Sequence, residues 1–389
     1  MMKKGYLLLC LLFGCMCGGQ SQDFAQEKGA TSVVGEDTLQ EKKRGFLVLP
    51  IIVYAPETSL RLGVIGAKLF KLGGEGTQLS TLKIPISYTI NNQFKARLSH
   101  ELYLNQNRYI LDGHVEFSSV PLFFYGIGPN TEQDAEEIYT SRLIQVEQDF
   151  FRKVSKNFFV GGRFVFNNQK ITETIGEESL LEVDGLIPGN RGGTVSGLGL
   201  LLRWDRRDHV INSGQGTYLQ ADLTTYPSWL GSDFVFTKLN LDFRAFKPLL
   251  NHRHLLALQV LIEKNWGDPP FDFLALLGGD VIMRGHYQGR FRDKTLVAMQ
   301  LEYRLPLFRK EWIPEPGKLK FWQRWGMVFF AGTGTVGEEL SDSFPRNLKM
   351  SLGLGLRFLA FNKERLNIRI DFGFGSQLPG YYLNVKEAF

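Results

Sequence analysis

Arg284 is the side chain whose chemistry is most distinctive in this sequence. It lies in the glycine-rich stretch 277–290, with Met283 and Gly285 beside it and Tyr287 shortly after. A guanidinium is a rigid planar donor that can clamp carboxylates in a bidentate manner. We therefore expect Arg284 to dock on acidic side chains inside the fold. The alternative is an ordinary solvated loop arginine, the usual state of this residue type.

Two further groups of polar residues could support catalysis or metal binding, but both have a simpler structural interpretation. One is a charged run that ends a candidate strand: Asp205, Arg207, Asp208 and His209. It could be the acid–base site of a hydrolase, whereas a charged strand end explains the same residues. His252 and His254 place two imidazoles on one strand face, but the sequence offers no third ligand of the kind that a zinc site needs. Since no nucleophile elbow or phosphate-binding loop is found either, we predict no enzyme activity, no cofactor and no metal site.

Alternation of polar and apolar residues predicts that β-strands position these side chains. In residues 295–305 the polar positions include Glu302, and in residues 366–374 they include Asp371, with apolar residues between them. The same alternation runs through residues 94–104 and 348–358. A helix, with about 3.6 residues per turn, would spread these charges around its whole circumference. The parity therefore turns Glu302 and Asp371 toward one polar side, where we expect them to be the acidic partners of Arg284.

The size of this alternating region indicates a transmembrane β-barrel. It runs from Gly45 to Phe389, which is 345 residues, without a linker or a change in composition. No apolar run reaches the ~18 residues of a membrane helix, whereas the alternating segments match the ~9–11 residues of a membrane strand. A soluble β-sandwich would alternate too, but it would be smaller and would leave sheet edges that a closed barrel removes. We predict an all-β fold, a transmembrane antiparallel β-barrel over residues 45–389, in the outer membrane of a bacterium.

The first residues predict export. Two lysines precede an apolar run from Tyr6 to Met16, which is too short to span a bilayer as a helix and fits a signal peptide over residues 1–21. Lipidation at Cys15 is the alternative. Residues 22–44 are polar and aperiodic, which predicts a flexible periplasmic leader. All three cysteines precede residue 22, and the remaining charge is nearly balanced at 43 basic against 40 acidic residues, so neither disulfides nor nucleic-acid binding is expected.

Several motifs together resemble one family of outer-membrane barrels. Arg284-Gly285 is followed by an aromatic residue, and the next candidate strand carries Glu302-Tyr303-Arg304-Leu305-Pro306. Three other stretches occur in the same order as in that family: Tyr54–Thr58, Trp204–Asp208 and Gly353–Arg357. The combination resembles the BamA/TamA superfamily, whose barrels are also called bacterial surface antigens.

The resemblance implies a specific version of the barrel. It implies sixteen strands, or roughly 22 of the 345 residues for each strand and its connection. It also implies a long extracellular loop that inserts into the lumen. The motif at the tip of that loop would be Met283, Arg284, Gly285 and Tyr287, and the strand-end motif would be Asp205, Arg207 and Asp208.

Three features depart from the family. Members that insert other proteins carry periplasmic POTRA domains ahead of the barrel, and only the short leader 22–44 is expected here, so the resemblance is to a POTRA-less member. Gly332 stands where the family has an acid, in the stretch 330–334. His286 precedes the aromatic residue of the loop motif. The carboxylates that dock the loop must therefore be others.

The resemblance implies a role in outer-membrane protein assembly or translocation, together with partner proteins. The expected partners are outer-membrane lipids, unfolded outer-membrane proteins and subunits of an assembly complex. The sequence pattern alone also fits a passive porin or a structural barrel subunit of an outer-membrane complex, and this alternative stays open.

The two ends of the candidate barrel carry their own signals. Pro50, in the first candidate strand 46–54, cannot donate a ladder hydrogen bond, which fits a weak seam between the first and last strands. The chain ends on Phe389, after apolar residues at period two up to Val385. A last strand that ends in phenylalanine resembles the recognition signal of outer-membrane barrels.

Overall fold

The computed structural model describes residues 46–55, 59–74, 76–90, 92–175, 179–315, 317–339, 341, 344–375 and 380–389. The predicted signal peptide 1–21 and leader 22–44 lie outside these residues, so both stay predictions. In the described part of the chain, no helix is long and apolar enough to cross a membrane.

Sixteen antiparallel strands form one sheet, and each strand is hydrogen-bonded to its neighbours in the sheet order. They are β1 (Phe46–Ala55), β2 (Ser59–Phe70), β3 (Ser80–Thr89), β4 (Phe94–Leu104), β5 (Tyr109–Phe124), β6 (Glu137–Ser155), β7 (Phe158–Ile175), β8 (Gly192–Asp205), β9 (Gly216–Tyr226), β10 (Phe236–Leu249), β11 (His254–Gly267), β14 (Thr295–Pro306), β15 (Trp325–Gly337), β16 (Lys349–Phe361), β17 (Leu366–Phe374) and β18 (Gly380–Val385). The described residues also form the paired short strands β12 (Ala275–Leu277) and β13 (Phe291–Asp293), and the 3-10 helices η1 (Ser228–Leu230) and η2 (Phe321–Arg324).

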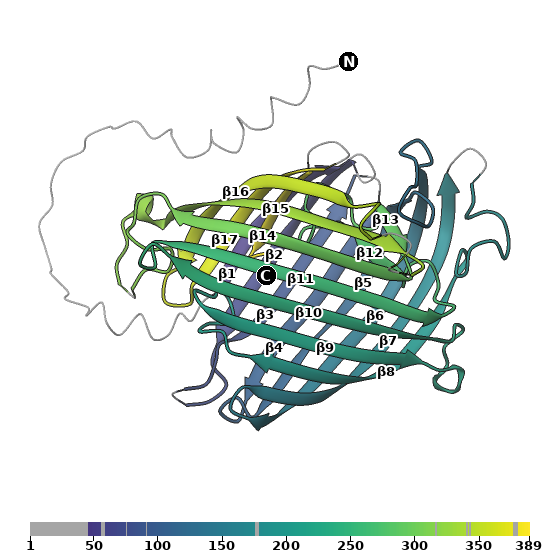
Figure 1. The fold of residues 1–389 in the computed structure, drawn as a ribbon. Coiled ribbons are helices and arrows are strands. Elements are labelled where there is room, and N and C mark those ends of the chain that lie inside the picture. The colour runs from purple at the N-terminus through teal and green to yellow at the C-terminus, as the bar shows by residue number, and fades with distance from the viewer. Residues whose placement is uncertain are drawn as a thin grey trace, which may run out of the picture. The chain divides into compact units, whose positions relative to one another are not determined.

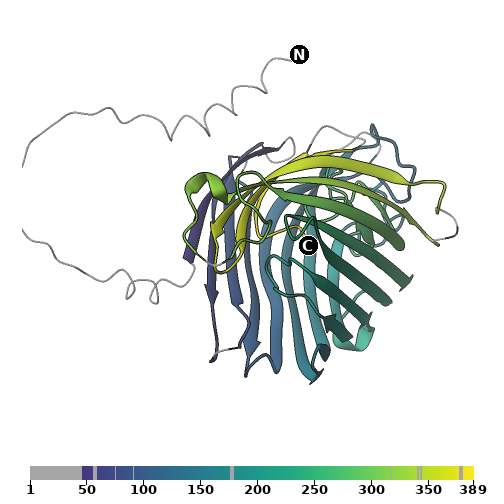
Figure 2. The same ribbon diagram turned by 60° about the vertical axis from the view of Figure 1, so that its left-hand side comes forward.

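The sheet curls round a lumen to form the β-barrel that the sequence predicts (Figures 1 and 2). Strand order follows chain order, so neighbouring strands are joined by local connections, apart from the long β11–β14 connection that holds β12 and β13. Inside the lumen, a side chain of the last strand of the sheet contacts one of the first three strands. There the Lys83 Nζ of β3 donates a hydrogen bond of 2.8 Å to the Asn384 Oδ1 of β18.

The predicted alternation of faces is confirmed on the strands that carry the candidate site. On β14, Met299 and Leu301 are 45% and 42% exposed, whereas Glu302 and Arg304 are fully buried. On β17, Asp371 is fully buried and its neighbour Ile370 is exposed. Apolar side chains therefore cover the outer surface, and charged side chains face the lumen, as a barrel in lipid requires.

The chain crosses the lumen at the end of the barrel where β1 begins and β18 ends, which we call the termini end. The β8–β9 connection places Ile211 against Leu69 of β2 and Leu366 of β17, on another part of the wall. The β14–β15 connection places Trp312 in a second buried cluster with Phe246 and Val328. The two connections are joined by a hydrogen bond in which the Trp312 Nε1 donates to the Asn212 Oδ1 at 3.3 Å. Apolar side chains therefore fill much of the lumen at this end.

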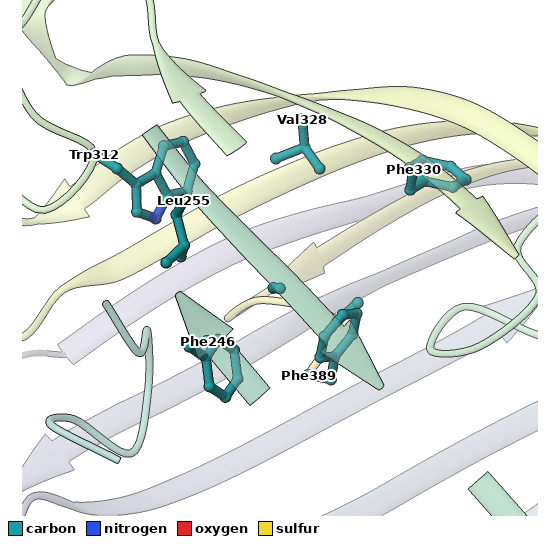
Figure 3. Packing of buried hydrophobic residues seen from close by; sticks show 8 residues of the cluster. Phe246, Leu255, Trp312, Val328, Phe330 and Phe389 are labelled. Atoms are coloured by element: carbon teal, nitrogen blue, oxygen red, sulfur yellow. The ribbon is translucent and has the colours of Figure 1, made fainter. Parts of the chain in front are cut away.

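The last residues differ from the sequence prediction. Strand β18 ends at Val385, not at Phe389, because Lys386 adopts a left-handed conformation (φ 77°) that turns the chain inward. Phe389 is only 7% exposed and packs in the lumen with Phe246 and Trp312 (Figure 3). The terminal aromatic ring therefore does not lie on the lipid face of the last strand.

Candidate functional site

The β11–β14 connection brings Arg284 to the barrel wall. Met283 and Gly285 on either side of it have positive φ values of 56° and 110°. A Cβ atom at Gly285 would lie 2.6 Å from the backbone carbon of Phe374, so only glycine permits this close approach to β17. The Gly285 backbone N–H donates to the Tyr382 hydroxyl on β18 at 3.0 Å.

The Arg284 guanidinium lies between the carboxylates of Glu302 and Asp371, which strand parity predicts to face the lumen. Its Nη1 donates to the Asp371 Oδ2 at 2.7 Å, and its Nη2 donates to the Glu302 Oε1. The guanidinium carbon also lies 3.7 Å from the centre of the Phe330 ring. All three charged side chains are fully buried, so water does not screen these contacts.

Three more arginines complete the network around the same two carboxylates. They are Arg304 on β14, Arg357 on β16 and Arg369 on β17. The Arg304 Nη2 lies 2.7 Å from Glu302, the Arg357 Nη1 lies 2.6 Å from Asp371, and the Arg369 Nη1 lies 2.8 Å from Asp371. Each carboxylate is therefore shared by at least two guanidinium groups.

Two further acids extend the network to the loop and to the chain terminus. Asp280 accepts from Arg369 at 3.2 Å and from Asn384 at 2.7 Å. Glu387, in the segment after β18, lies 2.7 Å from the Arg357 Nε. Burial alone would raise the pKa of the Glu387 carboxyl, but Arg357 holds it below its ordinary value.

Opposite charges compensate one another in the network, and among its members only Asp280, with 44% of its side chain exposed, reaches solvent. It contains four arginines and four acids: Arg284, Arg304, Arg357, Arg369, Asp280, Glu302, Asp371 and Glu387. Buried charges are tolerated when they are paired and hydrogen-bonded, and removal of one partner is strongly destabilising. The arrangement fixes the loop, strands β14, β16 and β17, and the chain terminus to one another.

The other residues of the loop motif contact different parts of the wall. Met283 is fully buried in a cluster with Ile282, Leu296 and Val336. The Tyr287 ring makes an edge contact with Phe123 of β5, 5.2 Å between centroids. The motif therefore joins the wall on both sides of the lumen. His286, which the sequence singled out as an interruption, contacts the backbone oxygen of Met350 through its Nε2 at 2.9 Å.

The strand-end motif organises the β8–β9 connection. The Arg207 Nη2 lies 2.6 Å from the Asp205 Oδ2, and its guanidinium carbon lies 4.4 Å from the centre of the Tyr218 ring. Asp208 accepts from the Gly214 backbone N–H at 2.8 Å and from Arg365 at 2.6 Å. These contacts hold a charged strand end in place, which is the simpler of the two sequence interpretations.

The histidine pair His252 and His254 does not form part of a metal-binding cluster in the described residues. His254 contacts the Tyr303 hydroxyl through its Nδ1, and His252 lies beside it at the rim of a small cavity. The described residues contain no cluster of three or more histidine, cysteine or acidic side chains that could hold a metal ion.

A polar cavity of about 680 Å³ separates the inserted loop from the far wall. Its wall carries charge, including Arg163, which lies 2.7 Å from Asp149 and 2.9 Å from Asp222. Tyr287 and Gln288 of the loop form part of the opposite side. The lumen thus retains an aqueous space between the loop and strands β4–β11.

Sequence reasoning missed part of the network. The positions of Arg304, Arg357 and Arg369 on the polar strand faces were visible from parity, but parity does not say which luminal charges meet across the barrel. Asp280 and Glu387 lie outside the wall strands, so no period marks them. The only indication of these two acids in the sequence is that buried arginines need acidic partners.

Known proteins share the barrel fold and a family domain with this chain. The Omp85 superfamily domain matches residues 69–377. BamA from Haemophilus ducreyi lacking POTRA domains 1–3 is 12% identical, with a TM-score of 0.53 over 88% of this chain and 69% of that one. CdiB from Acinetobacter baumannii is 13% identical, with a TM-score of 0.51 over 90% and 67%. No curated protein matches the sequence. At these identities the structural likeness shows a shared fold.

Proposed function

This chain belongs to the Omp85 superfamily of bacterial outer-membrane barrels, and from that premise we propose that it assists the assembly or translocation of outer-membrane proteins. The proposed role is not enzymatic. It depends on partner proteins and on outer-membrane lipids, and its clients would be unfolded outer-membrane proteins.

The observation that carries the proposal is the docked loop. Arg284 is held by Glu302 on β14 and Asp371 on β17, and its neighbour Gly285 donates to Tyr382 on β18. One loop tip therefore contacts the wall up to the last strand of the sheet. A change at that last strand, where a client would insert, would be transmitted directly to the loop.

The last strand is suited to such a change. β18 has six residues, and its register with β17 runs only from Gly373 to Ile368. β6, by comparison, has nineteen residues. Because ladder hydrogen bonds scale with paired length, β18 is among the strands that separate most easily. The tail after it is fixed instead by Glu387 and Phe389 inside the lumen.

The role of the network is tested by replacement of Arg284 in the native cell. The chromosomal copy is depleted while a plasmid supplies either the parent or Arg284→Ala, and outer-membrane proteins are quantified by mass spectrometry. We expect depletion to lower the levels of several barrel proteins and Arg284→Ala to restore them only in part. Arg191→Ala is the matched control, because Arg191 lies in the β7–β8 connection, at the same end of the barrel as the β11–β14 connection, and is 63% exposed.

The same experiment separates assembly from the porin alternative. A porin would leave the levels of other barrel proteins unchanged on depletion and would alter only uptake of small solutes. Full complementation by Arg284→Ala would remove the loop from the proposed mechanism. The cavity of about 680 Å³ is the feature that favours the porin, and its effect on conductance is argued below.

A further inference from the structure

The β14–β15 connection, residues 307–324, runs from the lumen to the outer surface of the barrel. Trp312, early in the connection, is 1% exposed and packs in the luminal cluster (Figure 3). Phe321 and Trp322, in helix η2, are 59% and 54% exposed. The same connection thus places Trp312 inside the barrel and Phe321 and Trp322 in its surroundings.

Helix η2 lies over the outer face of β15 and β16. The Phe321 ring is 5.5 Å from the Phe358 ring and 6.2 Å from the Trp325 ring, between centroids. Phe358 shares its strand face with Leu354, which is exposed to the surroundings of the barrel. Aromatic residues at the ends of membrane strands mark the level of the lipid headgroups. Phe321 and Trp322 therefore extend an aromatic belt that the strands themselves begin.

Arg309 fixes the inner and outer parts of the connection to each other. Its Nη2 donates to the Trp312 carbonyl oxygen at 2.9 Å, and its Nη1 donates to the Gln323 carbonyl oxygen at 3.0 Å. A guanidinium that bridges two carbonyl groups restricts their separation. The position of η2 at the membrane is thereby linked to that of Trp312 in the lumen.

The connection is also basic. It carries five basic and two acidic residues, a net charge of +3: Arg309, Lys310, Glu311, Glu315, Lys318, Lys320 and Arg324. Lys318 and Lys320 are exposed, and the Lys320 Nζ lies 5.4 Å from the centre of the Trp322 ring. Basic side chains beside interfacial aromatic residues have the chemistry that recognises anionic lipid headgroups.

We propose that η2 and the lysines before it form a binding site for anionic phospholipid headgroups in the periplasm-facing leaflet. Lys318 and Lys320 would contact the phosphates, while Phe321 and Trp322 would lie in the aromatic belt, where the headgroups meet the acyl chains. The surface is continuous with the lipid-facing wall through Trp325 and Phe358, which favours a lipid over a protein partner. Lipid binding at η2 would then affect the position of Trp312 in the lumen, through the Arg309 hydrogen bonds. It does not depend on the assembly function.

The test compares lipid neighbours of Trp322 in the full-length, reconstituted protein. The chain is placed in phosphatidylcholine bilayers with a minor fraction of acyl-brominated phosphatidylglycerol or, separately, acyl-brominated phosphatidylcholine. The Trp322 signal is the difference in fluorescence between the parent and Trp322→Phe. Each lysine beside an anionic surface favours anionic lipid roughly fivefold, so we expect markedly stronger quenching by the brominated phosphatidylglycerol.

Two variants decide the cause of any preference. Lys318→Gln/Lys320→Gln should equalise the quenching by the two lipids. Lys363→Gln, on the exposed β16–β17 turn, is the matched control and should leave the preference intact. Equal quenching in the parent, or a preference that survives loss of both lysines, would overturn the proposal. Heat-modified migration on gels confirms that each variant is folded, and Lys320→Gln alone replaces the double variant if that one fails to fold.

Discussion

Arg284 shows how one residue can position a loop without being indispensable to the fold. It contacts Glu302 and Asp371, but each carboxylate has other arginine partners on the wall, Arg304 for the first and Arg357 for the second. Loss of Arg284 would leave those wall pairs in place and remove the only one of these guanidinium groups that belongs to the loop. Arg284 thus anchors the loop to ion pairs that the wall strands form without it.

Arg284→Ala should therefore release the loop and leave the barrel assembled. Breaking a buried ion pair from one side costs about 3–5 kcal/mol, which is large for a loop and small beside the ladder hydrogen bonds of the wall. We expect proteinase K to cleave residues 268–294 faster in the variant, while heat-modified migration on gels stays that of the parent. Equal protection of the loop in both would contradict the docked arrangement. Arg191→Ala should behave like the parent.

The network also predicts non-additive effects. With Arg284 removed, the buried charges no longer balance, so neutralising Asp371 or Glu302 should then do less harm. The double variants Arg284→Ala/Asp371→Asn and Arg284→Ala/Glu302→Gln should be less impaired than the sum of their single variants, by about 0.5–3 kcal/mol for residues in one network. The midpoint of loop release in urea measures each effect. Strict additivity for both pairs would show that these side chains act independently.

At the residue scale, the sequence could predict the partners of Arg284 but not the whole network. Strand parity is a local property, and it correctly turned Glu302 and Asp371 to the lumen. Asp280 and Glu387 lie in irregular segments whose positions depend on how the loop and tail fold inside the barrel. Tertiary packing determines where these two acids lie, and no periodic pattern in the sequence predicts that packing.

Among the elements, the β8–β9 connection depends on a neutral histidine. The His209 Nδ1 accepts from the Ile211 backbone N–H at 3.2 Å, and Ile211 packs against Leu69 across the lumen. Burial, followed by the positive charge of Arg365, lowers the pKa of His209 to about 4. A protonated ring could not accept that hydrogen bond.

The termini end should consequently loosen in acid. Because the folded pKa lies below the usual value near 6.5, His209 contributes stability that is full above about pH 6.5 and is lost as the pH falls through about 4. Arg207, Arg365 and Lys386 oppose protonation, and Asp208 favours it. Cleavage of the connection by pepsin-like proteases, or labelling of an Asn212→Cys variant, should increase over this range. His209→Gln should flatten the pH dependence; an unchanged profile would assign it to other groups.

The tail after β18 was the element that sequence reasoning placed wrongly. Period-two apolar residues up to Val385 suggested that the pattern continues to Phe389, but the left-handed Lys386 ends the strand. Phe389 therefore packs in the luminal cluster and does not face the lipid. Positive φ at a lysine has no reliable sequence signature, so this turn could not be anticipated.

Phe389 should therefore contribute to stability through luminal packing. Phe389→Ala should lower the free energy of unfolding by about 3–5 kcal/mol, the range for a phenylalanine in a packed core, whereas Phe389→Leu should cost less because it keeps most of the volume. Thermal unfolding of the purified protein in detergent measures both. If the two variants fold with parental stability but fail to reach the membrane, the ring acts as a targeting signal and the packing is incidental.

At the scale of the whole molecule, the sequence predicted the wall of the barrel but not the side chains that fill its lumen. A wall of alternating strands follows from local sequence, and the superfamily resemblance implied the sixteen strands that form the barrel sheet. The apolar clusters at the termini end join Ile211 to Leu69 and Trp312 to Phe246. These contacts connect segments that are distant along the chain, and no periodicity encodes which segments meet.

That filling predicts how the barrel conducts ions. An empty barrel of about sixteen strands holds an aqueous channel, but here the docked loop narrows the lumen and the Trp312 and Ile211 clusters fill the termini end. The loop, with the polar cavity beside it, and the apolar clusters occupy successive levels of the lumen, so the more constricted level sets the current. The parent should show low, irregular conductance in planar bilayers. Large, steady currents from it would favour the porin alternative.

Constrictions in series make a sharper prediction than low conductance alone. Replacing residues 279–289 with a short glycine–serine linker removes the loop tip but leaves Trp312 in place, and Trp312→Ala does the reverse. Each change should raise the conductance only slightly, because the other constriction still limits the current. The combined variant should conduct far more than the sum of the two increases. If deletion of the loop tip alone gives a steady, open pore, the termini end is not closed, and the apolar clusters there leave a continuous path for water.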